Sequence, residues 1–153
     1  MKEMILRDGR KTLLDDDDFE LFNRNLWGVN SNGYARRGVG KRAKTLLLHR
    51  LVIDAPEGMF VDHINCDKLD NRKSNLRLCT SSQNKMNVGL KSNNTTGYKG
   101  VSFRKDRNKY RASIELNGKT FRLGTYTDPV EAAKAYDEAA KRLFGEFARL
   151  NFP

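Results

Sequence analysis

The chain has 153 residues, which allows one domain of ordinary size or two small ones and excludes a large multidomain enzyme. Hydrophobic residues make up 38% and charged residues 31%, so there is apolar material for compact modules but not for one thick core. Lysine and arginine number 29 against 19 aspartates and glutamates, and the net charge of +10 indicates an anionic partner, nucleic acid ahead of an anionic membrane.

No apolar run approaches the roughly 18 residues that a membrane span needs, and the first residues lack the continuous apolar stretch of a signal peptide. We therefore expect an intracellular, cytoplasmic protein with no membrane partner. Cys66 and Cys79 form no CxxC pair, so we interpret both as small buried hydrophobes rather than as a disulfide or a zinc site.

Residues 1–45 are expected to be rich in β-structure. Asp8-Gly9 and Asn32-Gly33 are short-turn signals between apolar segments, and they predict hairpins near residues 3–14 and 25–37.

The acidic run of residues 15–18 precedes Phe19, Phe22 and Leu26, whose spacing suits one face of a short helix. Carboxylates favour the positive start of a helix. The alternative is a metal cluster, but four adjacent carboxylates cannot converge on one ion without unusual backbone geometry. We therefore exclude the run from the functional site.

The middle of the chain predicts a strand, a polar loop, a second strand and a helix. Asp62-His63 lies in a short extended run, and Leu76–Cys79 alternates as a second one. Thr80–Gln83 has the spacing of a capping box, so a helix that begins there would carry Asn84 in its first turn. The Asp-His pair and this helix are expected to face each other.

These residue types suit hydrolysis of a phosphodiester, which needs an activated water and a cation beside the phosphate oxygens. Asp62 and Asn84 offer oxygen ligands for a hard ion such as Mg²⁺, with Mn²⁺ as a substitute. His63, with an ordinary pKa of about 6.5, is suited to general-base work. Asn75 is expected to tie down the polar loop through its amide.

The matching residues of this segment are His49-Arg50, Asp62-His63, Leu69-Asp70-Asn71-Arg72, Asn75 and Asn84. Over residues 46–87 they resemble the HNH nucleases, most of all the phage and intron homing endonucleases whose motif ends in Asn. The resemblance implies that Asp62 and Asn84 bind the metal, that His63 is the general base and that Asn75 holds the loop, which makes His63 and Asn75 the catalytic pair. It also implies 3′-hydroxyl and 5′-phosphate products and a phage or mobile-element context.

Structural interpretations of these residues remain open. His49 stands among apolar neighbours, and we interpret it as a satisfied histidine at the edge of an apolar element rather than as a catalytic one. For Asp62, His63, Asn75 and Asn84, the alternative is a turn-rich loop in which the side chains cap backbone groups.

Residues 88–97 combine small polar residues with two glycines and no periodic apolar face, which predicts a linker. Beyond it, residues 98–122 hold the strongest positive charge of the chain. The acidic residues of this stretch are Asp106 and Glu115, and its basic residues are Lys99, Arg104, Lys105, Arg107, Lys109, Arg111, Lys119 and Arg122.

Residues 98–126 alternate as three strands, and Asn117-Gly118 between the last two is a strong hairpin signal. Asp128 and Pro129 then begin a helix that is expected to run to about Phe144. The predicted arrangement is a three-stranded antiparallel sheet packed on one helix, with a partly basic open face.

Residues 98–153 resemble the DNA-binding domain of the plant apetala/ethylene-response-factor (ERF) type. The matching stretches are Tyr98–Val101, Leu123–Tyr126, Glu131–Ala140 and Leu150–Pro153. The resemblance implies that the sheet enters the major groove of duplex DNA. Lys99 and Arg104 are then retained basic contacts, and Arg122 stands where a Trp usually contacts DNA. Arg111 has no match in the motif and is a candidate contact on spacing alone.

We therefore expect an α+β nuclease with an N-terminal β-rich part at 1–45, a ββα-metal motif at 46–87, a linker at 88–97 and a DNA-binding domain at 98–153. Its expected function is Mg²⁺-dependent, site-selective nicking or cleavage of duplex DNA in a phage-infected or bacterial cell. A monomer with one catalytic cluster would nick, although the oligomeric state is open. The alternatives are a non-catalytic transcriptional regulator and an RNA-directed nuclease.

Overall fold

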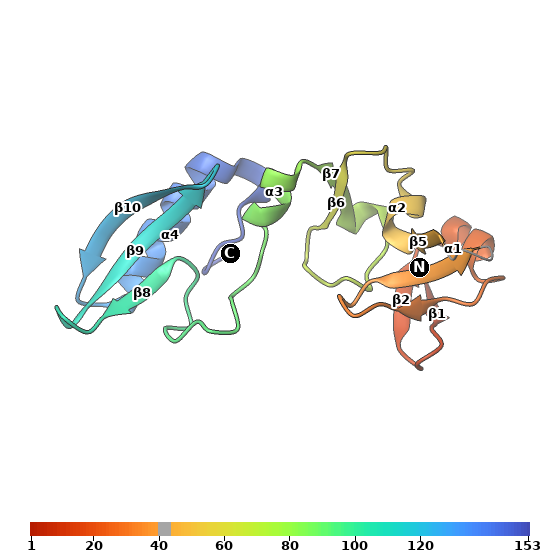
Figure 1. Ribbon diagram of the computed structural model, residues 1–153, viewed down its shortest axis with the longest axis horizontal. Coiled ribbons are helices and arrows are strands. Elements are labelled where there is room, and N and C mark those ends of the chain that lie inside the picture. The colour runs from red at the N-terminus through yellow and green to blue at the C-terminus, as the bar shows by residue number, and fades with distance from the viewer. Residues whose placement is uncertain (40–43) are drawn as a thin grey trace. The chain divides into compact units, whose positions relative to one another are not determined.

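The computed structural model describes residues 1–39 and 44–153, and it divides the chain into two compact units, Met1–Ser81 and Ser82–Pro153 (Figure 1). Residues 40–43, which belong to the part predicted to be β-rich, lie outside the described residues. The described chain forms small antiparallel sheets and a few helices, so the α+β class predicted from the sequence is confirmed.

The first unit begins with a hairpin followed by a short helix. These elements are β1 (Lys2–Ile5), β2 (Lys11–Leu14) and α1 (Asp16–Phe22). The turn contains Gly9 at φ +83°, a conformation that glycine adopts without steric cost. Leu26, which we expected on the apolar face of the helix, is 70% exposed because the helix already ends at Phe22.

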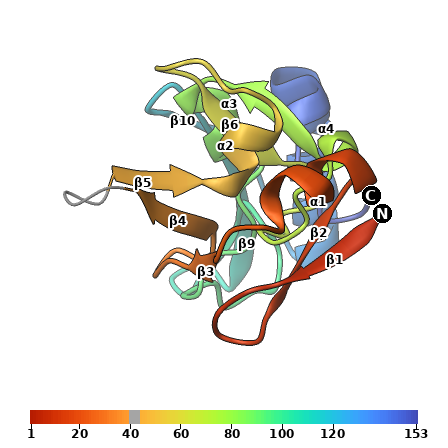
Figure 2. The same ribbon diagram turned by 90° about the vertical axis from the view of Figure 1, so that its right-hand side faces the viewer.

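A second sheet follows in the first unit, with its strands in the order β3, β4, β5 (Figure 2). The strands are β3 (Gly28–Val29), β4 (Ala35–Val39) and β5 (Lys44–Leu47), and helix α2 (Leu48–Val52) comes directly after them. The turn between β3 and β4 contains Gly33 at φ +87°. Both N-terminal hairpins therefore lie where the turn signals predicted them.

The first unit ends in a two-stranded sheet. Its elements are β6 (Phe60–His63), the 3-10 helix η1 (Lys73–Asn75) and β7 (Leu76–Cys79). The strands are antiparallel, and their register sets Asp62 opposite Arg77. Helix α3 (Ser81–Met86) follows at the boundary between the units.

The apolar core of the first unit is built around Trp27, which is only 1% exposed. Its indole Nε1 donates a hydrogen bond to the carbonyl oxygen of Phe22 at 3.0 Å, and the two rings meet edge to face. The other core members are Met4, Leu6, Leu14, Ala35, Leu48, Val52, Val61 and Leu76. Because the core joins all three sheets of the unit, it fixes β6 relative to β2 and β4.

The second unit is a three-stranded sheet covered by one helix. Its elements are β8 (Val101–Arg104), β9 (Lys109–Leu116), β10 (Lys119–Tyr126), α4 (Pro129–Phe144) and the 3-10 helix η2 (Gly145–Phe147). β9 lies in the centre of the sheet. Asp128 caps α4 by accepting a hydrogen bond from the backbone N–H of Val130 at 2.9 Å, so the helix begins where the sequence predicted.

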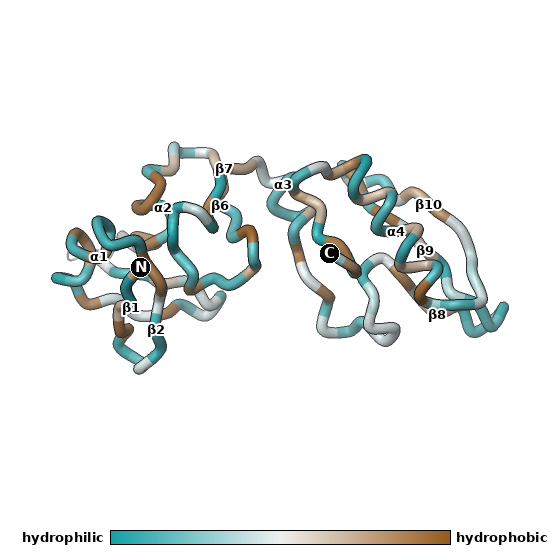
Figure 3. The backbone as a smooth tube through the Cα atoms, turned by 180° about the vertical axis from the view of Figure 1, so that it is seen from behind, coloured by the Kyte–Doolittle hydropathy of each residue, from teal (hydrophilic) through white to brown (hydrophobic). Residues whose placement is uncertain are grey.

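Helix α4 packs closely on the sheet through small side chains. Its buried face is formed by Ala132, Ala133, Tyr136, Ala139, Ala140 and Phe144. Hydrophilic and hydrophobic stretches alternate along the helix (Figure 3), as expected for an element with one covered face. None of the helices in the described ranges is long and apolar enough to cross a membrane.

Gly100 is required by the close approach of Tyr136. A Cβ atom at this position would lie 1.9 Å from the Cδ2 atom of the tyrosine ring, and the backbone has φ +76°. The end of the chain is tied down nearby, because Asp137 accepts hydrogen bonds from the backbone N–H groups of Asn151 and Phe152.

Residues 88–97, which we predicted to be a linker, belong to the second unit. Asn94 donates a hydrogen bond to the carbonyl oxygen of Tyr98 at 2.9 Å, and the Thr96 hydroxyl donates to that of Val101 at 3.1 Å. The contacts within the structure place the boundary between the two units between Ser81 and Ser82. The sequence instead predicts that the nuclease part ends at residue 87 and that the linker ends at residue 97. The four predicted segment boundaries stay a prediction.

Candidate functional site

Strand β6 carries Asp62 and His63, which are 5% and 4% exposed. Successive side chains of a strand point to opposite faces. Asp62 accordingly meets Arg77 on the neighbouring strand, whereas His63 meets Asn71 and His49. The two candidate residues are adjacent in the chain but have different partners.

The imidazole of His63 is held by a chain of buried hydrogen bonds. Its Nε2 lies 3.1 Å from Oδ1 of Asn71, and the Asn71 amide donates to the Thr12 hydroxyl at 2.7 Å. The Thr12 hydroxyl uses its single hydrogen to donate a hydrogen bond to the carbonyl oxygen of Leu69 at 2.6 Å. The Asn71 oxygen must therefore accept from His63, which puts the imidazole proton on Nε2 and the lone pair on Nδ1.

Three rings gather around this imidazole. The ring centres of His49 and His63 are 5.2 Å apart, and Tyr34 lies 4.9 Å from His49 and 5.8 Å from His63. Burial, with smaller contributions from nearby His63 and Arg50, lowers the pKa of His49 to about 3. Burial also lowers the pKa of His63, although the Asn71 hydrogen bond and nearby carboxylates oppose the shift. Both imidazoles are therefore neutral at pH 7.

The interpretation of His49 as a satisfied edge histidine was only half right. The residue is buried, at 5% exposure, but within the described residues its Nδ1 has no hydrogen-bond partner, and its ring packs against His63. The sequence did not predict that His49 packs against His63, because α2 and β6 are brought together by tertiary packing. The sequence signal that could have indicated this position was the His49-Arg50 pair at the start of the HNH-like motif.

Asp62 forms a nearly buried ion pair with Arg77. The Arg77 Nε and Nη2 atoms lie 2.9 and 2.7 Å from Oδ2 of Asp62, and the two side chains are 15% and 6% exposed, respectively. Arg77 was absent from the predicted site. Within 1–39 and 44–153, no cluster of three or more histidine, cysteine or acidic side chains is arranged to hold a metal ion.

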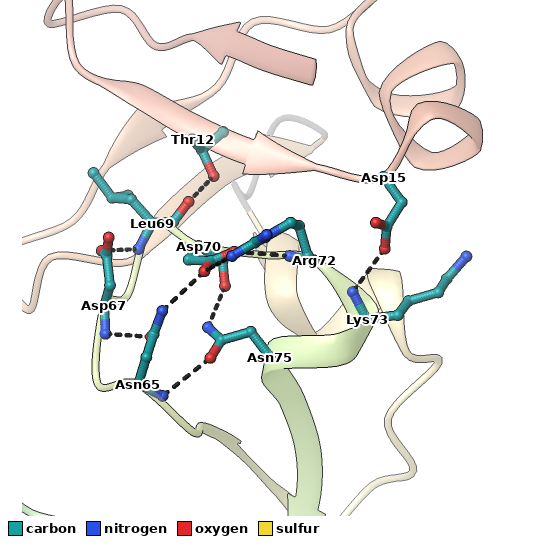
Figure 4. A network of polar contacts seen from close by, with 9 residues as sticks. All are labelled: Thr12, Asp15, Asn65, Asp67, Leu69, Asp70, Arg72, Lys73 and Asn75. Carbon is teal, nitrogen blue, oxygen red and sulfur yellow. Dashed lines mark hydrogen bonds and ion pairs between the residues drawn. The ribbon is translucent and has the colours of Figure 1, made fainter. Parts of the chain in front are cut away.

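Asn75 fastens the loop that follows β6 (Figure 4). Its amide donates to the carbonyl oxygen of Asp70 at 2.8 Å, and its Oδ1 accepts from the backbone N–H of Asn65 at 3.0 Å. Asp70 in turn binds Arg72 through both carboxylate oxygens, and this hydrogen bonding lowers the pKa of Asp70. The loop that carries Asn71 therefore has little freedom, which fixes the partner of His63.

The acidic run braces the same loop from the other side. Asp15 accepts a hydrogen bond from the backbone N–H of Lys73 at 2.8 Å, and Asp18 pairs with the Lys73 ammonium at 3.0 Å (Figure 4 draws the first contact). Asp16 binds the N-terminal amine at 2.6 Å. These carboxylates begin α1 and anchor neighbouring parts of the chain, and their exclusion from the metal site stays a prediction.

Asn84 lies half-buried on α3 and belongs to the second unit. Its assignment as a metal ligand beside Asp62 stays a prediction.

The open face of the second unit carries Arg104, Arg111 and Arg122. Strand register pairs Arg111 with Ser102 and Arg122 with Ser113, on the face opposite the residues that pack on α4. Arg104 binds Asp106 through two contacts of 3.0 Å.

Two of the candidate DNA contacts, Arg111 and Lys99, differ in whether their hydrogen-bond donors already have a partner within the protein. The Nε atom of Arg111 is buried with no hydrogen-bond partner in the described part of the chain. The Lys99 ammonium, in contrast, donates to the carbonyl oxygen of Met86 at 2.6 Å and lies over the ring of Tyr136. Lys99 therefore points to the helix side of the sheet, and its predicted role at DNA stays a prediction.

Comparison with known proteins finds a family match for both parts of the chain. Residues 47–86 match the HNH endonuclease family, and residues 96–146 match the AP2 domain. The chain is 35% identical over 138 residues to an uncharacterized HNH endonuclease of Acanthamoeba polyphaga mimivirus, which covers 88% of this chain and 71% of that protein. It is 32% identical over 94 residues to protein 3.8 of Escherichia phage T7, covering 61% and 77%.

The second unit has plant relatives. Over 58 residues it is 48% identical to an ethylene-responsive transcription factor of Arabidopsis thaliana, covering 37% of this chain and 32% of that protein. Fold and matches together define a nuclease-type enzyme joined to a DNA-binding module. The chain belongs to the HNH endonuclease family and carries an AP2/ERF domain, so the resemblance recognised in the sequence is confirmed.

Proposed function

We propose that the protein is a homing-type endonuclease that nicks or cleaves duplex DNA at selected sites, with Mg²⁺ as its cofactor and Mn²⁺ as a substitute. The observation that carries the proposal is the buried imidazole of His63, oriented by Asn71 and adjacent to Asp62, in a chain of the HNH endonuclease family. A neutral imidazole with a fixed orientation is suited to take a proton from water near pH 7.

In this proposal Nδ1 of His63 is the basic atom, because Nε2 carries the ring hydrogen and donates a hydrogen bond to Asn71. When Nδ1 takes a proton from the attacking water, the ring becomes an imidazolium. Nearby Asp62, Asp67 and Asp70 favour that positive charge electrostatically. Asn71 keeps the ring in place throughout the transfer because its own amide is bound to Thr12.

Asp62 and Asn84 are the proposed metal ligands, and their donor atoms fit a hard ion. One carboxylate and one amide oxygen suit Mg²⁺, which keeps several waters and takes few protein ligands. The bound ion supplies positive charge that neutralises the phosphate oxygens. Arg77 fixes the orientation of the Asp62 carboxylate by binding its Oδ2 atom.

Duplex DNA is the proposed substrate, held by the basic sheet face with Arg104, Arg111 and Arg122 as contacts and Lys99 as a further one. Guanidinium groups bind phosphates and guanine edges through paired donors. Arg111 stands on the open face of the sheet, opposite the residues that pack on α4. We propose that the protein acts on DNA in the cytoplasm of a phage-infected or bacterial cell.

The test is incubation of supercoiled plasmid with the full chain and Mg²⁺, with and without a chelator. We expect nicked circles or linear DNA that carry 5′-phosphates, and an unchanged plasmid when the chelator is present. Nicks alone would fit one catalytic cluster per chain. Intact plasmid with correctly folded protein and Mg²⁺ would contradict the proposal. Equal cleavage of duplex RNA would redirect it to an RNA-directed nuclease.

A non-catalytic DNA-binding regulator is the second candidate, and the Asp62–Arg77 pair favours it. A guanidinium already neutralises the carboxylate that would hold the ion. If Arg77 replaces the metal, Mg²⁺ will neither stabilise the protein nor support cleavage, although DNA binding will persist. The plasmid experiment separates the two functions, since only the nuclease requires the chelatable ion.

A further inference from the structure

A basic depression lies in the first unit, apart from His63 and its partners. It has a volume of about 480 Å³, and its lining includes Arg7 before the first turn, Arg36 and Arg37 on β4, and the apolar residues Leu26 and Val29. None of these arginines takes part in the contacts around His63, so the depression is a separate feature of the unit.

Arg37 is held in a defined position at this depression. Its guanidinium carbon lies 5.2 Å from the centre of the Trp27 ring, and that ring is fixed in the core by its hydrogen bond to Phe22. The Nε atom of Arg37 is buried, and no group in the described residues accepts its hydrogen bond. Arg37 is therefore a cation held in a fixed position over Trp27.

The positive charge of the depression is not cancelled by the protein. Across 1–39 and 44–153, Arg7, Arg36 and Arg37 form no ion pair. Among the described residues that line the depression, Asp8 is the single carboxylate, and Arg10 binds it at 2.9 and 2.6 Å and lowers its pKa. The local balance favours an anion from outside the chain.

The shape of the site indicates which anion. Guanidinium groups recognise phosphate through paired donors, and three of them line one surface. Arg7, Arg36 and Gly38 are exposed, so the depression is open along its rim rather than closed around a small molecule. An open, arginine-lined surface suits a continuous strand of phosphates.

We infer that this depression binds the phosphodiester backbone of duplex DNA, and that the nuclease unit thus has a DNA contact of its own besides the AP2 sheet. The inference rests on the proposed function in taking DNA as the polymer. Arg37 contacts the phosphate from a fixed position over Trp27, and Arg7 and Arg36 contact it from the rim.

The test compares the full chain with Arg7→Ala and Arg36→Ala, which remove exposed side chains outside the core. Arg24→Ala is the matched control, because it removes the same charge from an exposed position in the same unit outside the depression. Affinity for a labelled DNA duplex is measured by fluorescence anisotropy at several salt concentrations. Each test variant is expected to bind about three- to tenfold more weakly, with a salt slope lower by about one, and the control to change by less than about twofold.

Four results would overturn the inference. Equal losses in all three variants would mean that only the general field matters, and no loss in the test variants would mean that the depression is not used. A loss confined to duplex RNA would exclude DNA as the ligand. If inorganic phosphate raises the melting temperature of the wild type but not of Arg36→Ala, while DNA affinity is unchanged, the depression binds a free anion instead.

These outcomes are distinguishable from failure of the proposed function. A wild-type chain that binds no DNA would remove the proposed function itself, whereas a chain that cleaves plasmid normally with Arg7→Ala and Arg36→Ala would remove only the inference.

Discussion

The two units differ in what they bury. The first unit encloses a set of polar side chains, all of them buried: Thr12, Asp18, His49, Asp62, His63, Asp70, Asn71 and Asn75. The second unit buries mainly alanines and aromatic rings, and its arginines Arg104, Arg111 and Arg122 stand on the open sheet face. Burial of polar groups costs stability unless each is hydrogen-bonded.

This difference assigns a separate physical task to each unit. In the first, an interior network fixes the imidazole of His63. Its neighbour His49 has a ring nitrogen, Nδ1, with no hydrogen-bond partner among the described residues. In the second, a tightly packed apolar layer leaves the opposite face free to carry guanidinium groups. Substitutions in the first unit should therefore alter chemistry and pH response, and those in the second should alter stability and affinity.

The sharpest test of this division is His63→Ala. Because removal of a general base typically costs 10²- to 10⁴-fold in rate, we expect cleavage to fall by at least about a hundredfold. The nicking rate on plasmid measures this loss. DNA affinity, followed by anisotropy with the same preparation, should stay within about twofold. A parallel loss of binding would show that the two tasks are not separated.

Gly100→Ala is expected to damage the second unit. The added Cβ would collide with the Tyr136 ring, and with the backbone at φ +76° we expect a loss of about 2–4 kcal/mol in the free energy of unfolding. Gly118→Ala is the matched control, because that glycine has φ +75° but open space around it, and about 1 kcal/mol is expected there.

Hydrogen exchange of the second unit measures both variants, while the fluorescence of Trp27, the single tryptophan, reports the first unit. If Gly100→Ala and Gly118→Ala lose the same stability, the collision with Tyr136 is not the cause.

The pH dependence of stability should also separate the units, since both histidines of the chain lie in the first. The pKa of His49 is about 3 in the folded state and about 6.5 when unfolded, so below pH 6.5 the unfolded chain binds more protons. The free energy of unfolding therefore falls as pH falls, by at most about 1.4 kcal/mol per pH unit for this group.

Urea unfolding followed by Trp27 fluorescence between about pH 7 and pH 5 measures this slope. His49→Phe keeps an aromatic ring without the titrating nitrogen and should reduce this slope, while His63, whose pKa is also lowered, keeps part of it. A wild-type curve already flat over this range would mean that His49 titrates normally in the fold.

Thr12→Val tests the hydrogen-bond chain behind His63. The valine keeps the shape but leaves the Asn71 amide without its acceptor, so the imidazole is less firmly oriented. By analogy with outer-shell partners of other sites, we expect kcat to fall about tenfold with KM little changed. Thr12→Ser retains the hydroxyl and should restore the rate. A change in KM alone, or no rescue by serine, would contradict a positioning role.

The structure could be predicted from the sequence to different extents in the two units. In the second unit, the signals were local: alternation along β9, the Asn117-Gly118 turn and the Asp128 cap all act within a few residues. In the first unit, both hairpins were predicted from turn signals and His63 from its motif.

The contacts that give His63 its properties were not predictable from local patterns. Asn71 and Thr12 are 59 positions apart, and nothing in their neighbourhoods pairs them. Arg77 opposes Asp62 only once the register of β6 and β7 is known. Lys99 matched a family position, but its ammonium is used by Met86, a contact set by the packing around α4.

The smallest expected effect is that of Arg104→Ala. Since Arg104 is already paired with Asp106 at the exposed edge of the sheet, part of its charge is compensated before DNA arrives. We expect affinity for duplex DNA to fall about two- to fivefold and the salt slope to fall by about one, with cleavage of bound DNA unchanged. Arg111→Ala should cost more, because within the described residues no carboxylate compensates the charge of Arg111.

Asp106→Asn provides the opposing control for this last prediction. It frees Arg104 and removes a negative charge, so DNA affinity should rise rather than fall. Anisotropy titrations of the three variants against one duplex decide the order. If Arg104→Ala weakens binding more than Arg111→Ala, the pair with Asp106 orients Arg104 for DNA instead of competing with it.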